Sequence, residues 1–203
     1  SRQATPPQSR RAAKPAQRYI GWLAGVLAPG ISRPAGSSND SRRLREQLTF
    51  HCHDDIVRQA RQPGSRIDIR LGHDGQPVVT APQLTLRLHQ HPLIGCIWEA
   101  RLPASKAAER LLDAIGGGAA GCSIGFRGSR HWHIERRDQL RIVDGLVLNH
   151  IAVLDPRGES KPAYPAAVVV ASRSTAVRCP DDLRREADAY AWQVIKRQHG
   201  VNT

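Results

Sequence analysis

Alternation between apolar and polar residues predicts several short strands in this chain of 203 residues. In RIDIRL (66–71), Ile67, Ile69 and Leu71 would lie on one face of a strand, with polar residues on the other face. Asp144-Gly145 separates two further strand-like segments, which predicts a β-hairpin. The segments that we interpret as strands are 19–27, 66–71, 84–88, 96–102, 131–135, 140–143, 146–154 and 166–172.

Apolar residues at helical spacing predict a helix at 105–115 and another at the end of the chain. The first is expected to end at Gly116, and the terminal helix has acidic residues at its start and basic residues at its end, as the helix dipole favours. Two shorter helices are expected at 41–48, with Ser41 as N-cap, and at 54–64. The expected apolar face of the terminal helix contains Leu183, Ala187, Tyr190, Ala191, Val194 and Ile195.

The predicted strands are short and are joined mainly by turns. This pattern favours an antiparallel sheet that curls or closes, in a mainly β (α+β) fold, over a doubly wound sheet. Residues 1–18 are rich in Pro, Gln, Arg and Ala, and we expect them to be disordered. The chain has no apolar run near the roughly 20 residues that span a bilayer and no secretory hydrophobic segment, which predicts a soluble, intracellular protein.

The net charge is +12, with 30 Lys and Arg residues against 18 Asp and Glu. An excess of this size indicates an anionic partner, which could be an acidic protein, a membrane surface or nucleic acid. The arm at residues 1–18 is basic, but no basic helix with interleaved aromatic residues and no zinc-finger or RNA-binding motif accompanies it. A solubilising or loosely electrostatic tail therefore fits the pattern better, and we do not expect specific nucleic-acid binding.

The stretch GGGAAGCSIGF (116–126) places five glycines around Ser123. GCSIG matches the Gly-x-Ser-x-Gly pattern, although here a helix precedes the serine and a strand follows it, the reverse of the α/β-hydrolase order. A serine hydroxyl needs a neighbouring base and oxyanion donors before it can act as a nucleophile. By itself, the stretch fits either an ordinary glycine-rich loop or a serine that is presented to a substrate.

Two histidines occur where an imidazole could activate that serine. His73 follows the strand RIDIRL in the turn GHDG, where its ring can be held firmly and still face a cleft. His150 interrupts the apolar segment LVLNHIAVL (146–154), where burying an imidazole is unfavourable unless the ring has a partner. A core histidine with a satisfied hydrogen bond is the alternative interpretation of His150.

In order and spacing, several segments resemble the prohead (capsid maturation) proteases of tailed bacteriophages with HK97-like capsids, over about residues 19–172. The matching segments are IGWLAGVL (20–27), LGHD (71–74), LTLRL (84–88), WEARLP (98–103), GCSIGF (121–126) and PAYPAAVV (162–169). The resemblance implies the fold of the herpesvirus assemblins, a small, mainly antiparallel β-barrel with surrounding helices. It divides the chain into a basic arm (1–18), a protease-like domain (19–172) and a linker with a C-terminal helix (173–203).

The resemblance also implies roles for individual residues: Ser123 as nucleophile, His73 as general base and Asp74 as its structural neighbour. The third position departs from the family, because LNH stands where these proteases usually have Leu-x-Glu, so that His150 replaces an acid. The order His73, Ser123, His150 is similar to the His-Ser-His arrangement of the herpesvirus enzymes. A neutral imidazole stabilises the imidazolium less than a carboxylate does, which predicts a slow enzyme.

The backbone N–H groups around Ser123 are the candidate oxyanion donors, with Gly121, Ile124 and Gly125 as site-forming residues. Cys122 is a rival nucleophile, although a small buried thiol is the simpler interpretation. Serine chemistry needs no cofactor, and none is expected. No metal site is expected either, because the three His-x-His pairs, His51/His53, His89/His91 and His131/His133, lack evident further ligands.

The function implied by the resemblance is that of a serine endopeptidase that cleaves capsid or scaffold protein, and itself, during phage head assembly. The major capsid protein or the scaffold protein would be its substrate, and we expect a homo-oligomer without a membrane partner. It would act in the host cytoplasm, inside the assembling prohead. The alternative is a catalytically inactive structural or scaffold component of the phage head with a protease-like fold.

Overall fold

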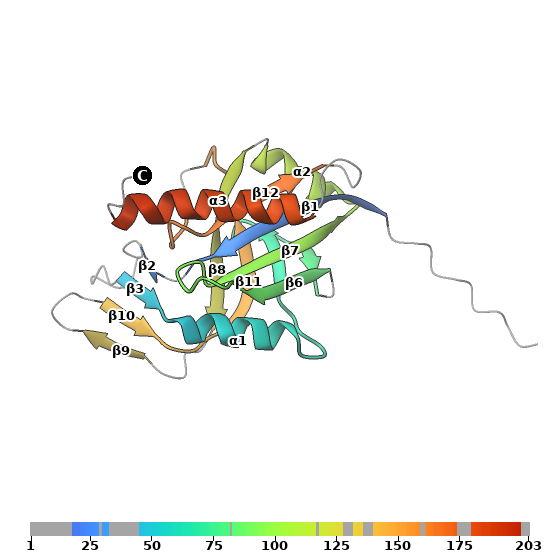
Figure 1. Cartoon of the computed structure of the whole chain (residues 1–203). Helices are drawn as coiled ribbons and strands as arrows, with labels where there is room; N and C mark the ends of the chain where they lie inside the picture. Colours follow the sequence, from blue (N-terminus) through green and yellow to red (C-terminus); the bar gives the residue numbers. More distant parts are fainter. Residues whose placement is uncertain are drawn as a thin grey trace, which may run out of the picture.

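The computed structural model describes residues 18–28, 30–32, 45–81, 83–116, 118–127, 132–135, 140–158, 161–173 and 180–199. The strands, labelled in Figure 1, are β1 (Tyr19–Leu27), β2 (Gly30–Ile31), β3 (Arg45–Leu48), β4 (Asp68–Leu71), β5 (Pro77–Thr80), β6 (Leu84–Leu88), β7 (Cys96–Pro103), β8 (Ala119–Arg127), β9 (Trp132–Glu135), β10 (Leu140–Val143), β11 (Val147–Val153) and β12 (Val168–Ser172). The helices are α1 (Phe50–Ala60), α2 (Lys106–Ile115) and α3 (Pro180–His199). Apart from Arg18, the basic arm expected at residues 1–18 lies outside the described residues.

Eight strands form one sheet in the order β5-β4-β11-β8-β12-β1-β7-β6, and this sheet curls into a nearly closed barrel (Figure 1). Its neighbouring strands are antiparallel except β4 and β11, which run parallel. The fold is therefore mixed α+β and mostly strands, which confirms the predicted fold class, barrel-like sheet and C-terminal helix. Among the described helices, none combines the length and the apolar character needed to cross a membrane.

The barrel interior is filled by large apolar side chains, because each strand directs every second residue inward. Trp98 on β7 is the largest of the fully buried residues. Its indole covers Gly25 on β1, where any side chain would overlap the ring, so this position requires a glycine. The remaining core is mostly aliphatic, and its fully buried members include Leu23, Ile67, Ile69, Leu102, Leu148 and Ile151.

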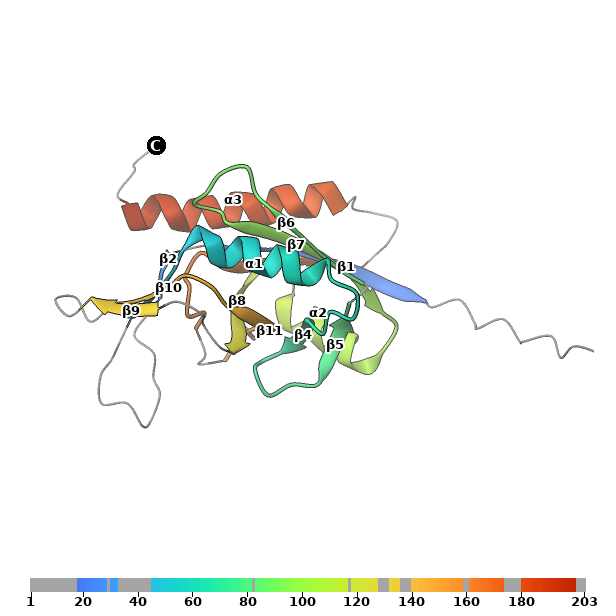
Figure 2. The ribbon, with the colours of Figure 1, turned by 90° about the horizontal axis from the view of Figure 1, so that it is seen from below.

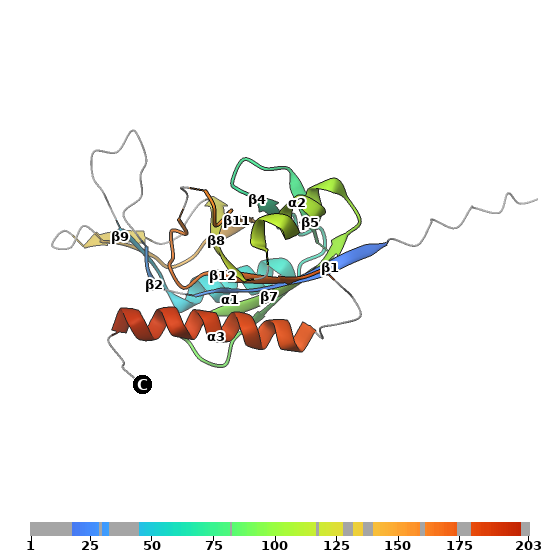
Figure 3. The ribbon, with the colours of Figure 1, turned by 90° about the horizontal axis from the view of Figure 1, so that it is seen from above.

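Helix α3 lies across the outer face of β1 and β12 (Figure 3). Tyr190 and Val194 pack at the margin of this contact. The predicted apolar face of the terminal helix is therefore confirmed, and it is covered by the protein's own barrel. The residues that α3 buries recur every fourth position: Leu183, Ala187, Ala191 and Ile195.

Four other strands form a second sheet, in the order β2-β3-β10-β9, at one end of the barrel beyond the start of α1 (Figure 2). The helix predicted at 41–48 is wrong in its described part, because β3 pairs with both β2 and β10 and this pairing outweighs local helix propensity. The hairpin predicted at Asp144-Gly145 is also wrong, because β10 and β11 belong to different sheets. Asp144 Oδ1 instead accepts a hydrogen bond of 2.6 Å from Thr49 Oγ1, just before α1.

Candidate active site

Three neighbouring strands, β4, β11 and β8, carry the candidate site on the outer face of the barrel sheet. Residues that lie opposite each other on paired strands point to the same face, as do residues two apart along one strand. Ile69, Ile151 and Ile124 belong to the barrel core, so the residues before and after each of them on its strand face outward. The outward-facing residues form two adjacent rows across the three strands: Asp68–His150–Gly125 and Arg70–Ala152–Ser123.

His73 reaches this face from the turn that follows β4. Gly72 begins the turn with a φ of 70°, and its N–H donates to the Val153 carbonyl at 2.8 Å. The Nδ1 atom of His73 lies 3.0 Å from Nε2 of His150, and the rings meet edge to face with their centroids 5.2 Å apart. One of these nitrogens carries the hydrogen and donates a hydrogen bond to the other, so two of the three predicted residues are directly joined.

Gly121 and Gly125, the two glycines of the Gly-x-Ser-x-Gly motif, each allow another residue to lie close over β8. A β-carbon at position 125 would overlap the Cε1 and Nε2 atoms of His150. A β-carbon at position 121 would lie 2.8 Å from the ring of Pro162, in the segment that leads into β12. Gly125 therefore provides the space in which the imidazole of His150 lies.

The surroundings of His150 favour its neutral form. Burial lowers the pKa of this imidazole, and the nearby positive charges of Arg70 and His73 lower it further. The carboxylates of Asp68 and Asp74 have the opposite, smaller effect on the same pKa. A neutral imidazole keeps one unprotonated nitrogen, which is what an acceptor for the His73 N–H requires.

Asp68 and Arg70 form a bidentate ion pair in the same two rows, with Nε–Oδ1 at 2.6 Å and Nη2–Oδ2 at 2.8 Å. Asp68 is buried, and its hydrogen bonds raise the pKa of Arg70. Sequence reasoning assigned neither residue to the site. The available signal was the alternation in RIDIRL, which places both side chains on the face opposite the core.

Ser123 lies inside strand β8, which begins at Ala119, so the loop interpretation of the glycine-rich stretch is wrong. Its direct partner on β11 is Ala152, which makes it a diagonal neighbour of His150, about 7–8 Å away between Cα atoms. The residue is 6% exposed. Within the described residues, no hydrogen bond joins its hydroxyl to His73 or His150, so the serine shares the face of the histidine pair but is not hydrogen-bonded to the candidate base.

The chain matches no protein-family model, no curated protein and no solved structure. The chemistry of the site therefore has to be inferred from its own side chains. A serine hydroxyl on the same face as two hydrogen-bonded imidazoles brings together the types of group that can serve as a nucleophile, a base and a group that orients the base. This combination of groups is suited to acyl transfer.

Within the described part of the chain, one edge of β8 is unpaired beside Ser123. Leu154 donates its N–H to the Gly121 carbonyl, and the antiparallel ladder therefore turns the Ser123 N–H towards β11 as well. The N–H of Cys122 points to the opposite edge, where it donates to the segment before β12. Ile124 directs its N–H to that same edge, but β12 pairs with β8 only as far as Gly121. Among the predicted oxyanion residues, Ile124 has an N–H without a partner strand in the described structure.

The described cysteines are buried, free thiols. Cys122 points away from the site face, with its Sγ 3.6 Å from the Val26 carbonyl, and burial raises the pKa of its thiol. Burial also raises the pKa of Cys96 to about 12. A buried thiol with a raised pKa is a poor nucleophile, so Cys122 is better interpreted as a small core residue.

The His-x-His pairs do not gather ligands in the described structure. His51 and His53 lie on α1 and not on a strand, so one is exposed and the other is buried. His89 accepts a hydrogen bond of 2.9 Å from the backbone N–H of His91. His131 lies outside the described residues. Within the described part of the chain, no three metal-ligating side chains come together.

Proposed function

We propose that this chain is a serine endopeptidase in which Ser123 is the nucleophile, His73 the general base and His150 the group that orients the base. The observation that carries the proposal is the 3.0 Å contact between His73 Nδ1 and His150 Nε2. It uses the nitrogen of His73 that a triad base directs to its third member and leaves Nε2 free for the serine proton. The lowered pKa of His150 supports the acceptor role of its ring.

In this mechanism, Ser123 Oγ attacks the peptide carbonyl carbon while His73 Nε2 takes the hydroxyl proton. The imidazolium keeps its Nδ1–H hydrogen bond to neutral His150, and the unpaired N–H of Ile124 donates to the developing oxyanion. His73 then gives the proton to the leaving amine, which breaks the peptide bond and leaves an acyl-serine. Water then gives a proton to His73 Nε2 and attacks the ester carbonyl, and His73 returns the proton to Ser123 Oγ as the acyl C–O bond breaks.

The substrate class follows from the resemblance to prohead proteases: capsid or scaffold protein, and the chain itself, during phage head assembly in the host cytoplasm. The net charge of +12 supports an acidic partner such as a scaffold segment. Because His150 stands where the family usually has an acid, the expected turnover is slow. A slow protease suffices when enzyme and substrate are packed together at high local concentration.

An inactive structural component of the phage head is the second candidate, and one observation favours it. Ser123 is 6% exposed and makes no hydrogen bond to His73 within the described residues. Catalytic hydrogen bonds are often long in the absence of substrate and tighten when it binds, so this geometry is compatible with an active enzyme. The two candidates differ in whether the hydroxyl of Ser123 is needed for processing.

The deciding experiment co-expresses the chain with the major capsid protein and measures the masses of both proteins. Wild type should shorten the capsid protein, itself or both, whereas Ser123→Ala should leave the masses unchanged. His73→Ala should slow processing by about 10²- to 10⁴-fold, the usual contribution of a general base. Cys122→Ala, which removes the neighbouring thiol, should process like wild type. Equal masses for wild type and Ser123→Ala would leave only the structural role.

A further inference from the structure

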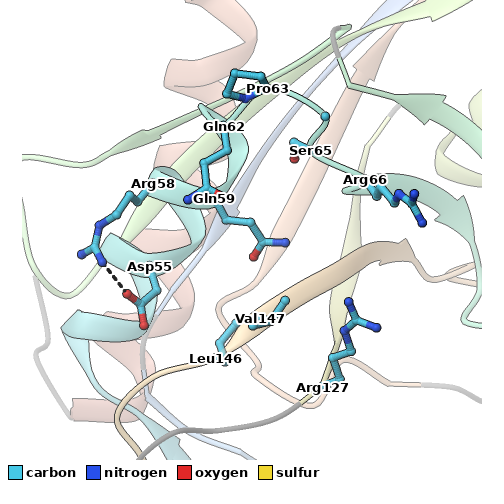
Figure 4. A pocket seen from close by; sticks show the side chains of 11 residues that line it. Asp55, Arg58, Gln59, Gln62, Pro63, Ser65, Arg66, Arg127, Leu146 and Val147 are labelled. Carbon is cyan, nitrogen blue, oxygen red and sulfur yellow. Dashed lines mark ion pairs between the residues drawn. The ribbon is translucent and has the colours of Figure 1, made fainter.

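A hollow of about 440 Å³ lies at one end of the site face, between α1, the loop before β4, and the adjoining ends of β8 and β11. Figure 4 shows Arg66 and Arg127 on one side of this hollow, across from Asp55 and Arg58 on α1. Leu146 and Val147 contribute its apolar floor. The hollow thus combines cationic groups with an apolar surface.

The strand register places this hollow in line with the candidate site. Arg127, Gly125 and Ser123 alternate along β8 and therefore share one face. Arg66 lies two residues before Asp68, which faces outward in the row of His150. Arg66 is therefore the next outward-facing position on this side of the row, just before β4 begins. Four residues of extended chain separate Arg127 from Ser123, which corresponds to about 13 Å.

The positive charge of the hollow is not neutralised on the Arg66 and Arg127 side. Both residues are exposed, and neither has an ion pair or hydrogen bond from its side chain within the described residues. Arg58, in contrast, pairs with Asp55 at 3.1 Å and with Asp54 at 3.2 Å. Two free guanidinium groups at one hollow are suited to bind a carboxylate, because each presents a planar fork of donors.

The other walls favour an acidic side chain over a phosphate. Asp55, although it is paired with Arg58, places a carboxylate in the lining, and this carboxylate disfavours a doubly charged phosphate more than a singly charged carboxylate. Val147 is 37% exposed there, and this apolar surface suits the methylene stem of a glutamate. Gln59 is not available to a ligand, because its amide exchanges two hydrogen bonds with the backbone of Leu148, at 2.7 and 2.9 Å.

We infer that the hollow is a substrate subsite, in which Arg66 and Arg127 bind an acidic side chain of an extended peptide about four residues from the scissile bond. This inference rests on the proposed endopeptidase function for its position relative to the cleaved bond. The binding of an acidic side chain by Arg66 and Arg127 does not depend on the endopeptidase function. An extended peptide that lies along the site face has the same rise per residue as β8, so about four of its residues would span the distance from Ser123 to Arg127.

The test compares cleavage of a mixed peptide library by wild type, Arg66→Gln, Arg127→Gln and Arg127→Glu. Wild type should favour Glu over Gln, three to five residues from the cleaved bond, by about 10- to 100-fold, as expected for charged hydrogen bonds. Both Gln variants should lose this preference, and Arg127→Glu should shift it towards Lys or Arg. Arg61→Gln, an exposed arginine on the same loop that does not line the hollow, is the matched control and should keep it. Cleavage without an acidic preference would overturn the subsite and leave the protease intact.

If wild type cleaves nothing, the subsite is tested by binding. A labelled peptide with several glutamates and its glutamine counterpart are titrated against the full chain carrying Ser123→Ala. The subsite is supported if the Glu peptide binds more strongly, if adding Arg127→Gln to the Ser123→Ala chain removes this difference, and if adding Arg61→Gln does not. That result would hold even though the protease proposal had failed. Equal binding of both peptides would overturn it. Binding of a DNA duplex, but of neither peptide, through Arg66 and Arg127 would overturn it in favour of a nucleic-acid site.

Discussion

The imidazole of His150 occupies the space over Gly125, its direct partner across β11 and β8, and a β-carbon at position 125 would overlap the ring. Because His150 Nε2 lies 3.0 Å from His73 Nδ1, the same glycine also determines where the candidate base is held. The second glycine of the Gly-x-Ser-x-Gly motif therefore has a steric role. It affects the site through the space it leaves open and not through chemistry of its own.

Replacing Gly125 with alanine should displace His150 and lower kcat about as much as His150→Ala does, with little change in KM. Both variants remove the same hydrogen bond to His73, so the double variant should be no slower than either single one. Steady-state kinetics of the three variants measure this, with thermal unfolding to verify that each is folded. Gly118→Ala is the matched control, because a β-carbon there meets no atom of the described residues within 4 Å. Additive losses in the double variant would contradict the shared contact.

The pH dependence of catalysis should reveal the protonation state of His150. Its pKa is lowered mainly by burial, so the ring stays neutral to a lower pH than an ordinary histidine and then protonates. Protonated His150 cannot accept from His73, and kcat/KM should therefore fall on the acid side of the profile. His150→Gln keeps an acceptor oxygen but does not titrate, so its acid limb should be less steep. An unchanged limb would show that His150 does not accept this hydrogen bond.

The ion pair between Asp68 and Arg70 should stabilise the fold as well as the site. Asp68→Asn should lower the free energy of unfolding by about 1–3 kcal/mol, because Arg70 loses a charged, bidentate partner. In the Arg70→Met background, Asp68→Asn should lower the free energy of unfolding by less than it does in wild type. A double-mutant cycle by urea denaturation measures this coupling. Asp68→Asn should also lower the pKa of His150 further, since it removes a nearby negative charge, and NMR titration of the His150 ring reports this. A coupling near zero would contradict the proposed interaction.

The strands were predictable from the sequence because alternation is a local property, and β1 and β6 occur where apolar residues predict them. Their pairing was less predictable. Nothing in the pattern of 41–48 indicates that its second half pairs with β10, and nothing around Asp144-Gly145 indicates that the chain crosses there from one sheet to the other. Both features depend on contacts between segments far apart in the chain, which override local propensity. Strand β5 was missed, although it completes one edge of the barrel.

The candidate site was anticipated in the same partial way. Only the family resemblance suggested that His73 and His150, which are 77 residues apart, belong together, because no local pattern encodes a parallel pairing of β4 with β11. Once that pairing is known, the alternation along β4 places Asp68 and Arg70 on the same face. The residues that sequence reasoning missed were therefore those whose role depends on a neighbouring strand. The position of Ser123 inside β8 was obscured by its glycines, which are typical of loops.

His53 is a buried histidine that the proposed chemistry does not use. It is 0% exposed on α1, its Nδ1 lies 3.3 Å from the Thr49 carbonyl, and its Nε2 has no hydrogen-bond partner within the described structure. Burial lowers the pKa of His53 below the ordinary 6.5, and the backbone hydrogen bond to Thr49 opposes this only in part. The folded chain therefore holds His53 neutral where the unfolded chain would protonate it.

This difference makes the stability of the fold depend on pH. Between the lowered pKa and 6.5 the unfolded chain binds a proton that folded His53 does not, so stability is fully present above 6.5 and falls as the pH drops through that value. The slope from this group is at most about 1.4 kcal/mol per pH unit and ends below the folded pKa. Urea denaturation from pH 7.5 to 4.5 measures this, and His53→Leu should make the free energy of unfolding less dependent on pH. Replacing the exposed His51 with leucine is the control and should leave the pH dependence unchanged. His150 contributes a slope of the same sign in wild type and in both variants. If His53→Leu kept the full slope of wild type, the pKa of His53 would have to be the same in the folded and unfolded chains, and burial would not be what sets its protonation.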